Sequence, residues 1–319
     1  MNKRKTKALL FLFSILSFLF GCQSKNSSRV TSYPLRELSQ AGINEFALNG
    51  KPLSESLEEE YLILVAGHIY GSHKSSEPHP AQSFMDKLSY FSDLNPRFMV
   101  LLGDIVPHSS SSNFQDLEDS LLFDQPYPIL NAVGNHDVEN RQLYADRYGP
   151  TYYYFPYQSA YFIILDTELD NCRIKGDQLE MLESALNNAV NNPQITQIFI
   201  FTHKVIFFNQ GLFQRLTSNQ SNLPNDRYSC LFSNNYSRLL TDLFLPAAKS
   251  KPVYLIAGDV GAWGGNFTPY HTRYKGSDFH ILTTGLGDTP QDLVLVLSIK
   301  GDQTEIKYLQ LTKDLLSIQ

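Results

Sequence analysis

The stretch Arg97–Ile105 is the feature of this sequence that most limits how the chain can fold. An unbroken apolar run, Phe98 to Leu102, is followed at once by Gly103 and Asp104. A short continuous apolar run is typical of a strand buried on both faces, as in parallel sheets covered by helices. Because polar residues at strand ends are well placed for chemistry, this pattern predicts a layered α/β fold whose functional groups follow its strands.

The same alternation of buried strands and amphipathic helices runs through most of the chain. Strands are expected at 61–66, 98–102, 129–133, 160–166, 198–201, 253–257, 279–284, 293–299 and 305–311. Helices are expected at 80–94, 114–122, 137–148, 177–190 and 239–248. The aromatic segments within 152–166 predict a hairpin that turns at 156–159. The polar segment 207–236 has no clear periodicity, and long insertions of this kind often serve as lids or binding loops.

The N-terminus predicts export. Basic residues between Lys3 and Lys7 precede an apolar run, 8–20, that is too short for a comfortable membrane span. The run ends in Gly21-Cys22, which resembles a bacterial lipobox with an acylated cysteine. The predicted organisation is a signal peptide at 1–21, a flexible tether at 22–57 and one domain at 58–319. An ordinary signal peptide or an uncleaved anchor is the alternative.

An acylated Cys22 would hold the protein to the cell envelope by its lipid, at the outer membrane if the host is Gram-negative. Two further cysteines, Cys172 and Cys230, lie in polar loop sequence. An exported chain meets oxidising conditions, so these two are candidates for a disulfide. Two unrelated free cysteines remain the alternative, because spacing alone does not show that they approach each other.

The composition excludes several other classes of protein. Hydrophobic residues make up 42% and charged residues 18%, so the chain is neither disordered nor a multi-span membrane protein. The net charge of −6 gives no basic surface for a nucleic-acid duplex, and none is expected as a partner.

The polar residues that follow the predicted strands match the chemistry of a metal site. Carboxylate, imidazole and amide oxygen together suit manganese, zinc or iron, and a separate imidazole can act as an acid. Such an ion polarises phosphoryl oxygens and acidifies water, which is what hydrolysis of a phosphoester requires. The candidate residues are His68, Asp104, Asn135, His136, His203 and Asp259.

Three fragments resemble the calcineurin-like metallophosphoesterases, in particular their exported, purple-acid-phosphatase-like branch. They are Gly103-Asp104, Gly134-Asn135-His136-Asp137 and Thr202-His203-Lys204. The resemblance covers most of 61–311. It implies a four-layer α/β/β/α sandwich of two mixed β-sheets flanked by helices, and metal-dependent hydrolysis of phosphoesters. It also implies that His136 protonates the leaving group and that Asp137 orients His136.

Other fragments depart from the family pattern. The second metal of the family would use Asp104, Asn135, His203 and Asp259, all able to bind an ion. The first metal would fall to His68, Tyr70, Asp104 and Gly261, and glycine offers no side-chain ligand. His68, Tyr70 and His108 are therefore expected as pocket residues or replacement ligands.

Three alternatives stay open at this point. One divalent ion is held by Asp104, Asn135, His203 and Asp259; or two ions are held, with the first site rebuilt from His68, Tyr70 and His108 or His73; or no ion is bound. The first predicts an envelope-anchored, metal-dependent hydrolase acting on a phosphorylated small molecule or polymer. The last predicts an inactive lipoprotein that binds a glycan, a phosphorylated polymer or a protein.

Overall fold

A computed structural model describes residues 46–54, 58–72, 80–207, 235–260, 271–290, 292–311 and 315–317. Cys22 and the rest of the predicted leader lie outside these residues, so the lipid anchor stays a prediction. None of the described helices is long and apolar enough to cross a bilayer.

The first sheet has six strands in the order β12-β11-β10-β1-β2-β3. Their bounds are β1 Glu60–Ala66, β2 Phe98–Leu101, β3 Ile129–Asn131, β10 Leu293–Lys300, β11 Gln303–Gln310 and β12 Leu315–Ser317. β1, β2 and β3 run parallel, whereas β10 pairs antiparallel with β1 in the register Glu60↔Lys300. The last two strands continue this antiparallel pairing. The sheet is therefore mixed.

The second sheet also has six strands, in the order β4-β5-β6-β7-β9-β8. Their bounds are β4 Tyr153–Tyr157, β5 Ala160–Ile164, β6 Gln197–Thr202, β7 Val253–Ala257, β8 His271–Arg273 and β9 Phe279–Thr283. β5, β6, β7 and β9 are parallel, with antiparallel strands at both edges. The predicted hairpin is confirmed as β4 and β5. Its turn is tighter than expected, because Pro156 and Tyr157 still pair with β5.

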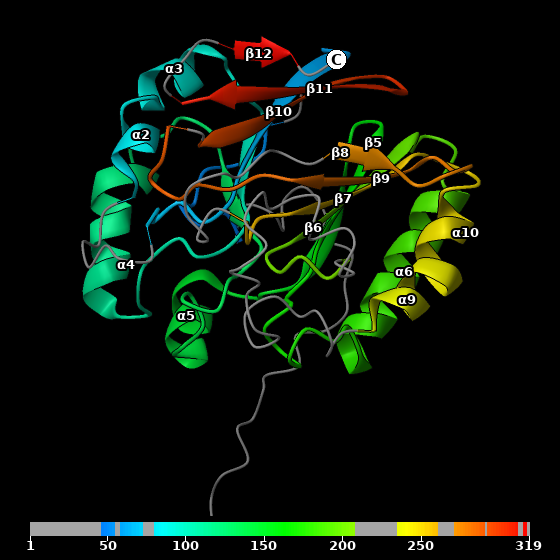
Figure 1. Ribbon diagram of the computed structural model, residues 1–319, viewed down its shortest axis with the longest axis horizontal. Coiled ribbons are helices and arrows are strands. Elements are labelled where there is room, and N and C mark those ends of the chain that lie inside the picture. The colour runs from blue at the N-terminus through cyan, green and yellow to red at the C-terminus, as the bar shows by residue number, and fades with distance from the viewer. Residues whose placement is uncertain are drawn as a thin grey trace, which may run out of the picture. The chain divides into compact units, whose positions relative to one another are not determined.

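Helices cover both sheets (Figure 1). The elements α2 Gln82–Met85, α3 Leu88–Asp93, α4 Ser111–Leu117, η1 Glu118–Leu122 and α5 Arg141–Tyr148 belong to the half that contains β1–β3. The elements α6 Gly176–Asn191, α9 Tyr236–Leu239, η2 Leu240–Phe244 and α10 Leu245–Ala247 belong to the other. In Figure 1, α2, α3 and α4 lie on one side of the strands, and α6, α9 and α10 lie on the opposite side.

Alternation along the strands explains the layers. In β1, Ile63 and Val65 join an apolar cluster shared with the second sheet, whereas Leu64 packs in a cluster with α2–α5. A third cluster places α6 against the outer face of the second sheet. Side chains that point alternately to opposite faces of a strand need an apolar layer on each face. The predicted four-layer α/β/β/α sandwich is confirmed.

Several elements differ in detail from the sequence prediction. The helix expected at 80–94 is broken in two, because Lys87 leaves the helical region with φ −104° and ψ 0°. The helix expected to begin at Asp137 begins at Arg141 instead. Asn140 caps it through its side chain, which accepts a hydrogen bond from the Leu143 amide.

Part of the predicted tether is folded onto the domain. Ala47 and Leu48 are buried. The side-chain amide of Asn49 donates to the carbonyl oxygens of Leu122 and Tyr127 at 3.2 and 2.8 Å. The sequence signal was weak here because the segment is short and not periodic.

Cys172 forms a disulfide. Its partner lies outside the described residues, as do both other cysteines of the sequence, Cys22 and Cys230. Pairing of Cys172 with Cys230 therefore stays a prediction.

Candidate metal centre

The carboxyl ends of parallel strands in both sheets bring the predicted residues together. The first sheet supplies three loops, after β1, β2 and β3, and the second supplies two, after β6 and β7. The first group of residues is His68, Asp104, Asn135 and His136, and the second is His203 and Asp259. The site therefore lies where strand ends of the two sheets meet.

The backbone at this place is unusual. His68 and Asp104 adopt positive φ angles of 55° and 52°, a region that few residues other than glycine enter. A Cβ atom on Gly103 would lie 2.4 Å from the Gly134 nitrogen, and one on Gly134 would lie 2.2 Å from Asp104 Oδ1. The two glycines therefore allow the loops after β2 and β3 to touch. Strained strand ends held in this way are common at functional sites.

Asp137 links the loops after β2 and β3 by hydrogen bonds. Its carboxylate accepts hydrogen bonds from the backbone amides of Asp104, Ile105 and Gly134 at 3.0, 2.8 and 2.8 Å. Burial and the nearby Asp104 raise the pKa of Asp137 to about 6, although the amides favour its charged form. Asp137 was predicted to orient His136. The structure instead directs its carboxylate to the backbone that holds Asp104, so Asp137 positions the loop that carries Asp104.

Two imidazoles converge on Asp104. His68 Nε2 and His203 Nε2 each lie 3.5 Å from Asp104 Oδ2, and His203 Nε2 lies 3.9 Å from Asp259 Oδ2. All four residues are at most 4% exposed. Within the described part of the chain, both ring nitrogens of His68 and Nε2 of His203 lack a hydrogen-bond partner. Buried polar atoms are normally paired, so this cluster calls for a further group.

The chemistry of the cluster fits a divalent ion. Ligand atoms of His68, Asp104 and Asp259 all lie within 4.8 Å of one another. The ring of His203 is oriented by its other nitrogen, because Nδ1 donates to the Leu102 carbonyl oxygen at 2.7 Å. A histidine ligand usually makes such a second bond, which leaves Nε2 free to bind. His68, predicted as a pocket residue or replacement ligand, is thus one of the buried residues that could hold an ion.

Without an ion, one proton of the cluster is held by the imidazole of His203 rather than by the carboxylate of Asp104. Burial opposes a charge on His203, but Asp104 and Asp259 outweigh it and raise the pKa of His203 to about 9. Burial likewise opposes ionisation of Asp104, but His203 and His68 hold the pKa of Asp104 well below its usual range. For His68, burial dominates and lowers the pKa of the ring. The metal-free cluster therefore contains one imidazolium, at His203.

Lys204, which follows His203 in its sequence fragment, was not predicted to have a role in the site. Its ammonium lies 2.5 Å from Asn135 Oδ1 and 2.7 Å from Asp259 Oδ2, and the residue is 4% exposed. Of the four predicted ligands, Asn135 and Asp259 are thus joined by a lysine, whereas Asp104 and His203 face each other directly. The sequence feature that could have indicated this role is a lysine directly after a histidine at the end of a strand.

His136 lies beside the cluster, with 27% of its side chain exposed. Its Nδ1 is 2.7 Å from the Pro107 carbonyl oxygen, which can only accept, so Nδ1 carries a proton. Its Nε2 lies 3.4 Å from the Tyr70 hydroxyl. Burial and Asp104 raise the pKa of Tyr70 well above its ordinary value, so in the metal-free protein the phenol stays protonated. Tyr70 therefore contacts both His136 and, by ring packing at 4.3 Å between centroids, His68.

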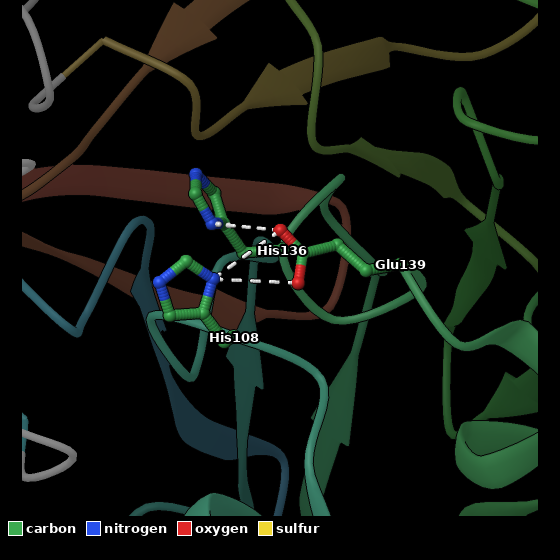
Figure 2. A group of neighbouring side chains, drawn as sticks. All are labelled: His108, His136 and Glu139. Carbon is green, nitrogen blue, oxygen red and sulfur yellow. Dashed lines mark hydrogen bonds and ion pairs between the residues drawn. The ribbon is translucent and has the colours of Figure 1, made fainter.

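His108 was predicted as a replacement ligand or pocket residue. The structure places it at the surface with Glu139, whose carboxylate lies 3.4 Å from His108 Nδ1 and 3.7 Å from His136 Nδ1. Figure 2 shows both oxygens of Glu139 turned toward the two rings. These three side chains form a second group of ligand type, separate from the buried cluster.

The stability of the metal-free protein should fall as the pH rises from about 6.5 to about 9. The folded state keeps the His203 proton up to about pH 9, whereas the unfolded state releases it near 6.5. Its contribution is complete below the lower value and lost above the upper one, a change of about 3 kcal/mol. Urea unfolding in EDTA across this window measures it. His203→Gln should flatten the profile, and His280→Gln should not, because burial already lowers the pKa of His280 to about 4.

No protein-family model matches this sequence, and no curated protein matches it either. Solved structures do. A dimetal phosphatase from Danio rerio has a TM-score of 0.55 at 14% identity, covering 81% of this chain and 98% of its own. A purple acid phosphatase from yellow lupin (Lupinus luteus) seeds has a TM-score of 0.52 at 12% identity over 83% of this chain. This chain spans only 54% of the lupin protein. At such identities the likeness concerns the fold, and the chain has the fold of the metallophosphoesterases.

Proposed function

We propose that this chain is an envelope-anchored, metal-dependent phosphoesterase-like hydrolase that holds a single divalent ion. The observation that carries the proposal is the buried cluster of His68, Asp104, His203 and Asp259, in which three imidazole nitrogens lack a partner among the described residues. This set differs from the predicted one by exchanging Asn135 for His68. Manganese, zinc and iron all suit two imidazoles and two carboxylates.

A divalent ion in this cluster would supply polarisation of a phosphoryl oxygen and a more acidic water. The residues of the chain would do the rest. His136, of which 27% of the side chain is exposed, would carry a proton on both ring nitrogens and give the one on Nε2 to the departing oxygen. The Pro107 carbonyl fixes the ring, and the Tyr70 hydroxyl lies against Nε2. Asp137 would act at a distance from the chemistry, by holding the loop that carries Asp104.

The charges of the site favour a phosphoryl anion. In the metal-free protein, two carboxylates, Asp104 and Asp259, face two cations, Lys204 and protonated His203. With a divalent ion in place of the His203 proton, the cluster would carry one more positive charge than it does without the ion. An anionic phosphorylated small molecule or polymer is therefore the class of substrate that we propose.

The experiment starts from full-length protein extracted with detergent from membranes, because recovery without detergent would contradict the anchor at Cys22. We expect about one tightly held ion per chain, and slow hydrolysis of generic phosphomonoesters or phosphodiesters with manganese, zinc or iron. His136→Ala should lower turnover by about 100-fold while leaving the ion bound. Protein that binds no ion and whose activity is unaffected by His136→Ala would rule out the hydrolase.

One observation favours a second candidate, an inactive lipoprotein that binds a glycan, a phosphorylated polymer or a protein. Lys204 already satisfies Asp259 and Asn135 without an ion. If the purified chain holds no metal and hydrolyses nothing, this candidate replaces the first.

A further inference from the structure

We infer that the ammonium group of Lys204 is a built-in cation that occupies the position between Asn135 and Asp259 and keeps a second divalent ion out. The inference deepens the proposed function, because it explains why the site would hold one ion rather than two. It concerns a residue of the chain itself, and its test does not depend on activity.

The contacts of the ammonium are those of a bound cation. Nζ lies 2.5 Å from the amide oxygen of Asn135 and 2.7 Å from Asp259 Oδ2, so it joins one neutral and one charged oxygen from different sheets. Both oxygens are ligand types that a hard divalent ion prefers. An ammonium uses the same oxygens without metal coordination, because each of its N–H groups can donate to one of them.

The position of the lysine is fixed by its backbone. The Lys204 amide donates to Thr167 Oγ1 at 3.1 Å. Its carbonyl oxygen accepts from Thr202 Oγ1 at 3.1 Å and from the Ile206 amide at 2.9 Å. A lysine whose main chain is held on both sides and whose residue is 4% exposed cannot swing into solvent without breaking the ion pair with Asp259. The charge is therefore a permanent part of the site.

Electrostatics explains the exclusion. A fixed positive charge at hydrogen-bond distance from Asp259 Oδ2 and Asn135 Oδ1 occupies these two oxygens and repels a second divalent ion that approaches them. Among the described residues, the ammonium is hydrogen-bonded to Asn135 and Asp259 alone, so the neighbouring position at His68, Asp104 and His203 is left to one ion. One ion fits beside the lysine, and a second does not fit in its place.

The test counts ions in full-length protein. Wild type, Lys204→Met, Lys204→Gln and the control Lys251→Met are loaded with manganese, dialysed and analysed for metal, and the thermal shift by manganese is recorded. Lys251 is a suitable control because its ammonium bonds only to the carbonyl oxygens of Ala189 and Asn192 in the described part of the chain. Its replacement therefore removes a lysine without opening a carboxylate.

We expect both Lys204 variants to bind one ion more per chain than wild type, at least about 100-fold more tightly than wild type binds a second ion. Lys251→Met should match wild type. The inference is overturned if folded Lys204 variants bind no additional ion. It is also overturned if neither variant folds with manganese present, because an ion in the vacated position would replace the lost charge. If wild type binds no ion but the Lys204 variants gain one, the single-ion hydrolase fails while this inference stands.

Discussion

Asp104→Asn should lower the affinity of the site for manganese or zinc by at least about 100-fold, and phosphoesterase activity with it. Among the described residues, Asp104 is the one carboxylate that lies 3.5 Å from the Nε2 atoms of both His68 and His203. The substitution removes its charge but keeps an oxygen that can accept from the His136 amide, now 3.0 Å from Oδ1. The loop should therefore stay folded, and the loss should appear in the metal content of the folded protein.

The matched control for this prediction is Asp146→Asn. Asp146 is an exposed residue of α5 whose carboxylate accepts from Gln142, so its charge is lost without any effect on the cluster. Metal analysis and titration calorimetry compare the two variants with wild type. A folded Asp104→Asn protein that retains the wild-type metal content would show that the ion, if any, binds elsewhere.

Asp137→Ala should destabilise the domain by about 3–9 kcal/mol, since three buried amides lose their acceptor and each costs about 1–3 kcal/mol. The amides belong to Asp104, Ile105 and Gly134. A loss of this size is comparable with the whole stability of an ordinary domain. Most of the protein should therefore be recovered unfolded, as circular dichroism and limited proteolysis would show.

Asp137→Asn separates this structural role from the orienting role that the sequence suggested. Asparagine keeps one acceptor oxygen, so only the bond to Oδ1 from the Ile105 amide is replaced by a repulsive contact. The expected cost is about 1–3 kcal/mol, with turnover per folded molecule close to that of wild type. A stable Asp137→Asn protein with a large loss of turnover would instead support a direct role beside His136.

The fold was largely predictable because its signals are local. Runs such as Phe98 to Leu102 show burial on both faces, and helix α6 shows a clear apolar stripe. The predictions that were wrong concern features that depend on the conformation of a single residue or on contacts with residues far along the chain. Lys87 breaks a helix that has sound periodicity on both sides. Asn49 is held by carbonyl groups more than seventy residues away, which no local pattern reveals.

From the sequence, the site could be predicted only as a set of polar residues that follow strands. The motif fragments identify Asp104 and His203, and the structure brings both together. The exchange of Asn135 for His68 as a proposed ligand depends on where the Lys204 side chain reaches, which sequence spacing does not define. A lysine reaches farther than either side chain that it joins. That it turns inward to Asp259 rather than outward to solvent depends on tertiary contacts, because its ammonium reaches oxygens on loops of both sheets.

The pairing of β1 with β10 sets the order in which this protein can mature. β1 lies inside its sheet with a neighbour on each side, and one of these neighbours, Leu293–Lys300, is near the end of the chain. Contacts between residues so far apart form slowly, since a long loop must close before they stabilise anything. The first half of the chain therefore cannot complete its sheet while the last strands are still being made.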